Sequence, residues 1–105
     1  MRGAPLALLA LAVAMSGCSD GRLSPAAERG RQVYLAHCIA CHNTDPAQPG
    51  PVGPPVKGSP RELLEAKVLK GSYPPGYAPK RPTKVMVPIP AVAPEIDALT
   101  EYLRR

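Results

Sequence analysis

Apolar residues recur at helical spacing in three stretches of the chain, and polar segments rich in proline and glycine separate them. The first stretch predicts a helix over residues 26–38, with Ser24 as its N-cap and Pro25 at the first helical position. Tyr34 gives this helix an apolar side, and Gly30 lies on the same face, four residues earlier. A glycine at this position indicates that a second helix approaches closely.

The second stretch has a recognisable helix start. Ser59 can cap the helix, Pro60 takes the first helical position, and Glu62 completes a capping box. We expect the helix to continue through residues 63–68 and to end at Gly71, because glycine commonly terminates a helix in a left-handed conformation.

The third stretch predicts a helix that begins at about Pro94 and runs to Leu103. Ile96, Leu99 and Leu103 recur at helical spacing and define its buried side, with Tyr102 beside them. The chain contains neither an internal repeat nor a strand pattern, so the predicted fold class is all-α.

Two loops rich in proline and glycine connect the predicted helices: a first loop over residues 43–58 and a second loop over residues 72–90. The chain has 15 prolines, no Phe, no Trp and only four Tyr among its 105 residues. A chain this short buries little apolar surface by itself. A domain of this size and composition therefore often needs an additional stabilising element.

The N-terminus has the pattern of an exported protein. Arg2 is followed by an apolar run over residues 6–14, which is too short to span a bilayer, and then by small residues. Residues 1–17 are therefore predicted to be a signal peptide of the general secretory type.

The end of this segment, Met15-Ser16-Gly17-Cys18, resembles the cleavage box of bacterial lipoproteins. In this interpretation Cys18 carries the lipid, residues 18–25 are a short tether, and residues 26–105 form one domain on the periplasmic side of a bacterial membrane. The alternative is an ordinary signal peptide with an incidental cysteine.

The run Cys38-Ile39-Ala40-Cys41-His42 has the C-x-x-C-H spacing of a c-type haem attachment site. Two thiols at this spacing can form thioether bonds with both vinyl groups of one porphyrin, and His42 is then the proximal iron ligand. A thioredoxin-like pair would need a βαβ context. A zinc site would need four ligands, and the spare His37 is poorly placed to complete one. A zinc site or a disulfide remains the alternative.

One methionine is a candidate for the second axial ligand. Haem in electron carriers usually takes Met or His as that ligand. Met1 and Met15 belong to the predicted signal peptide, so Met86, on the second loop, is the only methionine of the predicted domain. A methionine that merely fills a gap in the core is the alternative. His37 is the competing ligand, but it adjoins the attachment motif and cannot easily reach the opposite face.

With these motifs in this order, residues 26–105 resemble the class I cytochrome c family. Gly30, Tyr34 and Tyr102 match the glycine and aromatic positions at which the first and last helices of that family cross. Residues 53–58, which read G-P-P-V-K-G, are similar to the family's G-P-x-L-x-G stretch.

The resemblance implies a small cytochrome c fold, in which about three helices and the loops wrap around one covalently bound haem c. Cys38 and Cys41 would hold the haem, and His42 and Met86 would bind its iron. An apolar wall would favour the reduced state, and we expect it to include Val52, Val56, Leu64, Val68, Ile89 and Ile96.

The resemblance also implies two supporting contacts. The carbonyl of Pro54 would accept a hydrogen bond from the ring of His42 and so fix its orientation, and the nearby Gly50-Pro51 pair is the alternative to this stretch. A side chain of the second loop would bind a haem propionate, and the candidates are Tyr73, Tyr77 and Arg81.

The function implied is one-electron transfer in a respiratory or oxidoreductase chain, with redox proteins as partners, a membrane contact through the lipid anchor, and no organic substrate. The formal net charge is +5, and Lys80, Arg81 and Lys84 lie near Met86. These charges favour either an acidic patch on a partner or anionic lipid headgroups. Nucleic-acid binding is not expected of an exported haem domain without stacking aromatic residues.

Two other functions fit parts of the pattern. The long second loop would suit a dedicated haem subunit of a periplasmic dehydrogenase or similar complex. A haem enzyme or gas sensor with an open iron site is the further alternative, against which the presence of Met86 argues.

Overall fold

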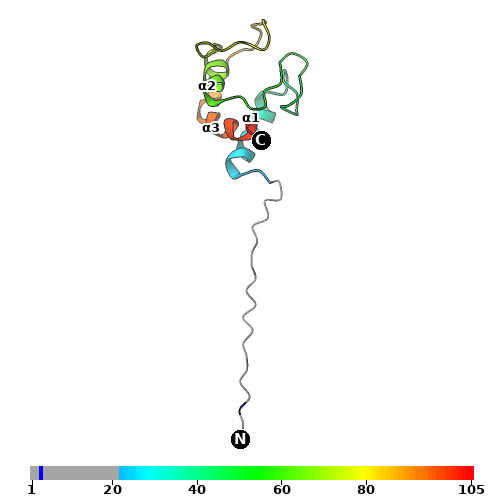
Figure 1. The fold of residues 1–105 in the computed structure, drawn as a ribbon, viewed down its shortest axis with the longest axis vertical. Coiled ribbons are helices and arrows are strands. Elements are labelled where there is room, and N and C mark those ends of the chain that lie inside the picture. The colour runs from blue at the N-terminus through cyan, green and yellow to red at the C-terminus, as the bar shows by residue number, and fades with distance from the viewer. Residues whose placement is uncertain (1–2, 4–21) are drawn as a thin grey trace.

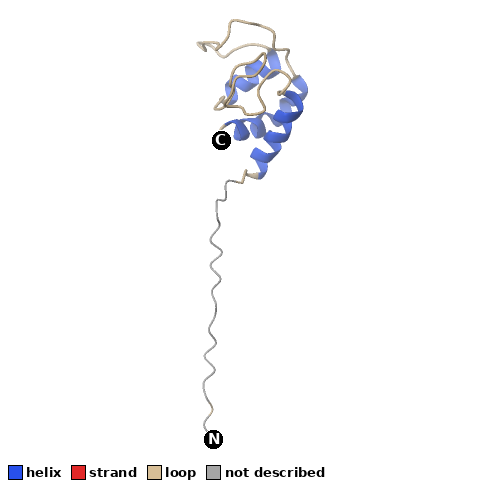
Figure 2. Ribbon diagram, turned by 90° about the vertical axis from the view of Figure 1, so that its right-hand side faces the viewer, coloured by secondary structure: helices blue, strands red, loops and turns tan. Residues whose placement is uncertain are grey.

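Three helical segments pack against one another, and the two long loops extend from one side of them (Figures 1 and 2). The computed structural model describes residue 3 and residues 22–105. The elements are α1 (Pro25–His37), α2 (Arg61–Leu64), the π-helix η1 (Glu65–Leu69), the 3-10 helix η2 (Pro90–Glu95) and α3 (Ile96–Leu103). No strand occurs in this part of the chain, and the predicted all-α class is confirmed.

The start of α1 follows from its first residues. The hydroxyl oxygen of Ser24 accepts a hydrogen bond from the N–H of Ala27 at 3.1 Å, and Pro25 occupies the first turn. A proline is tolerated there because its missing N–H would have no partner inside the helix. The predicted N-cap is confirmed, and the predicted bounds agree within one residue.

The start of the second helix differs from the prediction. α2 begins at Arg61 after Pro60, and no side chain caps it. The hydroxyl of Ser59 instead donates to the carbonyl of Val56 at 2.6 Å, and the N–H of Ser59 donates to the same carbonyl at 3.1 Å. The prediction of Ser59 as the cap was wrong, because this hydroxyl closes the turn that ends the first loop.

The end of the second helix is as predicted. The helix α2 continues directly as the π-helix η1, and Gly71 then adopts a left-handed φ of 66°. The N–H of Gly71 donates to the carbonyl of Lys67, and the N–H of Ser72 donates to the carbonyl of Ala66. Two carbonyl groups at the end of the helix thereby gain hydrogen-bond partners. Only a residue without a Cβ takes this conformation readily.

The core lies where α1 and α3 cross. An added Cβ at Gly30 would lie 2.0 Å from the carbonyl oxygen of Ala98 and 2.8 Å from Cβ of Tyr102. The rings of Tyr34 and Tyr102 meet beside this point, with centroids 5.6 Å apart. The predicted close approach at Gly30 is confirmed. The buried residues around it are Val33, Tyr34, Leu64, Val68, Val92, Ile96, Leu99 and Leu103.

In the described part of the chain, no helix is both long enough and apolar enough to cross a membrane. The predicted signal peptide over residues 1–17 and the lipid-bearing Cys18 lie outside the described residues.

Replacing Gly30 by alanine tests the helix crossing. Helix propensity alone would make this variant more stable by about 1 kcal/mol. The added methyl group meets backbone of α3, so we expect a loss of at least about 2 kcal/mol in the free energy of unfolding. Urea unfolding of the holoprotein measures this change. Gln32→Ala, at an exposed site on α1, is the control, and a Gly30→Ala protein as stable as the native one would contradict the crossing.

Candidate functional site

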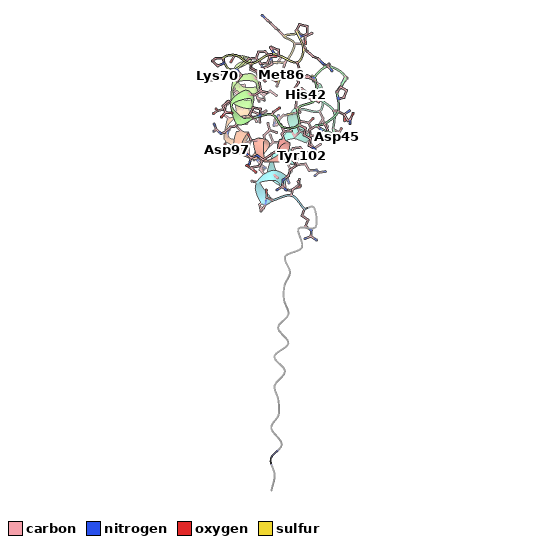
Figure 3. All side chains as sticks on the ribbon, in the orientation of Figure 1. His42, Asp45, Lys70, Met86, Asp97 and Tyr102 are labelled. Carbon is pink, nitrogen blue, oxygen red and sulfur yellow. The ribbon has the colours of Figure 1, made fainter. Side chains whose placement is uncertain are left out.

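The two loops, α2 and η1 surround a cavity of about 310 Å³ whose wall is largely apolar. In Figure 3, His42 and Met86 lie on the loop side of the molecule, and Asp97 and Tyr102 lie on the helical side. The structure brings every predicted site residue of the described domain to the wall of this one cavity: Cys38, Cys41, His42, Pro54, Tyr73, Tyr77, Arg81 and Met86.

The C-x-x-C-H run forms a tight turn at the end of α1. The N–H groups of Cys41 and His42 both donate to the carbonyl of Cys38, at 3.3 and 2.9 Å. This turn places both thiols and the imidazole on the cavity wall. Burial raises the pKa of the free Cys38 thiol to about 11, so the free thiol stays protonated at neutral pH. The cysteines Cys38 and Cys41 are not joined in a disulfide.

Around this motif the described residues form no group of three or more His, Cys, Asp or Glu side chains that could hold a metal ion by themselves. The exposed His37 lies at the edge of the cavity, beside the motif.

The ring of His42 is oriented by the first loop. Its Nδ1 atom lies 2.9 Å from the carbonyl oxygen of Pro54. A carbonyl can only accept, so Nδ1 donates the hydrogen, and the lone pair of Nε2 is left free to bind a metal. The N–H groups of Val52 and Gly53 donate to the carbonyl of Cys41 at 3.1 and 2.8 Å. These contacts hold the accepting loop directly against the attachment motif.

Gly53 permits this close packing. It is buried, and a Cβ there would lie 2.3 Å from Cε1 and 2.5 Å from Nδ1 of His42. Gly50 is constrained in the same way, because its Cβ would lie 2.3 Å from the carbonyl oxygen of Cys41. Any other residue at either position would displace the ring or the motif backbone.

Met86 faces the cavity from the second loop. Its side chain is partly buried and packs against the core, whereas the neighbouring Val85 and Val87 are 61% and 74% exposed. Val85 and Val87 also line the cavity, but most of the surface of each remains exposed. The N–H of Ile89 donates to the carbonyl of Val68 and fixes the loop just after Met86.

The three candidates for a propionate contact do not have equal surroundings. The rings of Tyr73 and Tyr77 stack with centroids 5.4 Å apart, and Nζ of Lys67 lies 4.4 Å from the centroid of Tyr73. The guanidinium of Arg81 donates to the carbonyl of Val52 at 2.7 Å. Arg81 is therefore already engaged in joining the two loops.

Lys67 lines the cavity and was missed by the sequence analysis. Its spacing from Leu63 and Leu64 places it on the buried side of the second helix, and this signal could have identified it. It lies in the π-helix η1, and such segments occur frequently at functional sites.

Tyr34 connects the helical core with the motif. It is 1% exposed and lines the cavity, and its hydroxyl donates to the carbonyl of Asn43, next to His42. Burial above all, with a smaller contribution from the nearby Cys38 and Tyr102, raises the pKa of Tyr34 to about 12.

The residues present fit a flat, apolar group that is held by two thioether bonds and bound to a metal through an imidazole. The two thiols, the free Nε2 and the thioether of Met86 share one apolar cavity. Of the six residues expected in the apolar wall, Val52, Val56, Leu64, Val68 and Ile89 line the cavity. Ile96 is instead 2% exposed within the helical core, so its expected place in the wall was wrong.

The comparisons with known proteins identify one family. The family model described as Cytochrome c matches residues 27–105. The curated proteins and the solved structures that were compared with the chain contain no match.

The raised pKa of Tyr34 makes a prediction about alkaline stability. The unfolded chain loses this proton near pH 10 and the folded protein near pH 12, so the free energy of unfolding should fall as pH rises between these values. Tyr34→Phe removes this dependence and costs about 1 kcal/mol at neutral pH through the lost hydrogen bond. Urea unfolding of both holoproteins measures the difference, and a gap that stays constant up to pH 12 would contradict the assignment.

Proposed function

The chain belongs to the cytochrome c family, and on this premise we propose that it is a membrane-tethered electron carrier with His42 and Met86 as the axial iron ligands. The family binds covalently attached haem c, which supplies a one-electron iron couple. The chain therefore takes part in haem-based electron transfer with redox partners, as a carrier rather than as an enzyme.

One observation supports the ligand assignment above the others: a single apolar cavity gathers both thiols of the attachment motif, the imidazole of His42 and the thioether of Met86. We assign the covalent bonds to Cys38 and Cys41. The hydrogen bond from Nδ1 of His42 to the carbonyl of Pro54 fixes the tautomer that leaves Nε2 free for the iron.

Met86 is proposed as the second axial ligand. Its side chain lines the cavity and packs against the core, whereas the neighbouring Val85 and Val87, which also line the cavity, are largely exposed. Ligation by His and Met raises the reduction potential of a haem. Filling the sixth position also leaves no open site for an organic substrate or for a gas, as an electron carrier requires.

The polar edge of the cavity is proposed to receive the haem propionates. Tyr73 and Tyr77 line the wall as a stacked pair, and Lys67 adds a positive charge over the ring of Tyr73. Arg81 uses one N–H group to donate to the carbonyl of Val52, but its guanidinium has five N–H donors in all. It therefore stays a candidate beside the two tyrosines.

The surface around the cavity suits an acidic redox partner. Residues 66–94 include no Asp or Glu, while the cations Lys80, Arg81 and Lys84 lie on the loop that carries Met86. The exposed valines of this loop supply an apolar contact area next to these charges. Small apolar patches with a charged rim are typical of transient electron-transfer encounters.

The location follows from the N-terminal pattern. We propose that residues 1–17 direct export, that Cys18 carries the lipid, and that residues 26–105 function on the periplasmic side of a bacterial membrane. The short tether would keep the carrier close to redox proteins in the same membrane.

Met86→Ala tests the ligand assignment. The oxidised native protein should show a low-spin spectrum with a long-wavelength band from methionine bound to iron. The variant should lose this band, bind carbon monoxide readily when reduced, and have a lower reduction potential. Val85→Ala, at an exposed site next to Met86, is the control and should keep the native spectrum. A native protein that is high-spin, with a spectrum unaffected by Met86→Ala, would contradict the assignment.

Cys18→Ser tests the anchor. Without the thiol no lipid can be attached, so the variant should move from the membrane fraction to the soluble periplasmic fraction with its haem content unchanged. Haem-stained gels of fractionated cells measure this, with Ser19→Ala as the control that keeps the lipidated residue. A variant that stays in the membrane fraction would exclude lipid attachment at this position as the cause of tethering.

A further inference from the structure

The part of the second loop that carries Met86 has almost no support from its own backbone. From residue 78 to residue 88, a stretch that the structure describes in full, no N–H or carbonyl group takes part in a backbone–backbone hydrogen bond. The nearest backbone–backbone hydrogen bonds lie on either side of this stretch. The N–H of Tyr77 donates to the carbonyl of Pro74, and the N–H of Ile89 donates to the carbonyl of Val68. The position of Met86 therefore depends on side-chain contacts.

Two consecutive cations supply such contacts. Nζ of Lys80 donates to the carbonyl of Pro55 at 2.8 Å, and Nη1 of Arg81 donates to the carbonyl of Val52 at 2.7 Å. Both bonds cross from the second loop to the first. Charged donors form stronger hydrogen bonds than neutral donors do, which suits them to hold a loop without regular structure.

The accepting carbonyls belong to the segment that also orients the proximal imidazole. Residues 52–55, which we call the carbonyl segment, contain Pro54, whose carbonyl accepts from Nδ1 of His42. The N–H groups of Val52 and Gly53 tie the same segment to Cys41. One short piece of backbone is thus bonded to the attachment motif on one side and to the Met86 loop on the other.

We propose that Lys80 and Arg81 are positioning residues that fasten the Met86 loop to the carbonyl segment and thereby keep Met86 at the sixth position of the iron. The inference rests on the proposed ligand role of Met86. It assigns to Arg81 a function other than a propionate contact, and to Lys80 a function other than a surface charge for docking.

The geometry explains why both anchors are needed. Ile89 fixes the chain on the C-terminal side of Met86, whereas on the N-terminal side the nearest fixed points are Lys80 and Arg81. If these two contacts are lost, the loop is held from Tyr77 to Ile89 only at its ends. The thioether would then leave the iron more often and admit a competing ligand.

The test compares imidazole binding to the oxidised holoproteins. The double variant Lys80→Ala/Arg81→Ala should bind imidazole about tenfold more tightly than the native protein, because each exposed charged hydrogen bond contributes a factor of a few. Lys57→Ala/Lys70→Ala is the matched control. It removes the same amount of charge from two exposed lysines whose side chains form no hydrogen bond or ion pair within the described residues. This control should bind imidazole as the native protein does.

A variant in which the two cations exchange positions shows whether the loss of these hydrogen bonds, and not a general destabilisation of the loop, is what admits imidazole. Lys80→Arg/Arg81→Lys keeps both charges and both donors, so it should restore most of the native resistance to imidazole. The methionine-to-iron band should weaken in the alanine double variant and recover in the exchanged one. If the alanine variant binds imidazole no more tightly than the matched control, the anchoring inference is overturned.

The same experiment distinguishes the two proposals. If Met86→Ala leaves the spectrum and the imidazole affinity unchanged, Met86 is not the ligand, and the anchoring inference fails with it. If Met86→Ala opens the iron but the alanine double variant behaves as the control does, only the anchoring inference fails.

Discussion

The hydrogen bond between Nδ1 of His42 and the carbonyl of Pro54 is the contact on which the rest of the site depends. It forms only because Gly53 lets the backbone lie against the imidazole ring, where any Cβ would overlap it. The bond leaves the opposite ring nitrogen free and so defines the direction from which His42 could bind a metal. The first loop is therefore part of the haem site, although it contributes no ligand of its own.

A small helical core has to hold the attachment motif in place. The chain has no Phe or Trp, and its core is a set of aliphatic side chains around Tyr34 where α1 and α3 cross. Gly30 allows that crossing, and Tyr34 extends from it to the carbonyl of Asn43 beside the attachment motif. The helical frame thus fixes the position of His42, while the loops, which lack regular structure, enclose the remaining surface of the cavity.

The sequence was sufficient for the features that local chemistry determines. Ser24 and Gly71 delimit their helices as predicted, and the C-x-x-C-H spacing indicated one site on which the predicted residues do converge. Other features, both local contacts and contacts between the loops, were missed or wrong. The hydroxyl of Ser59 donates to the carbonyl of Val56, three residues earlier, instead of capping the helix that follows it. The π-helical hydrogen bonding of η1 is not marked by any residue pattern in the sequence. The carbonyl partner of Arg81 could not be inferred either, because carbonyl groups carry no sequence identity.

An electron carrier would benefit if both of its proposed iron ligands, His42 and Met86, were bonded to the same short segment of backbone. Transfer is fast when the surroundings move little between the two oxidation states, and independent motion of the two ligands would add to that movement. Here His42 is bonded directly to residues 52–55, and the loop that carries Met86 is bonded to the same residues through Lys80 and Arg81. A displacement of this segment would move both sides together and leave the distance between the two proposed ligands nearly unchanged. Loops rich in proline are suited to this task, since their backbone has few alternative conformations once such contacts are made.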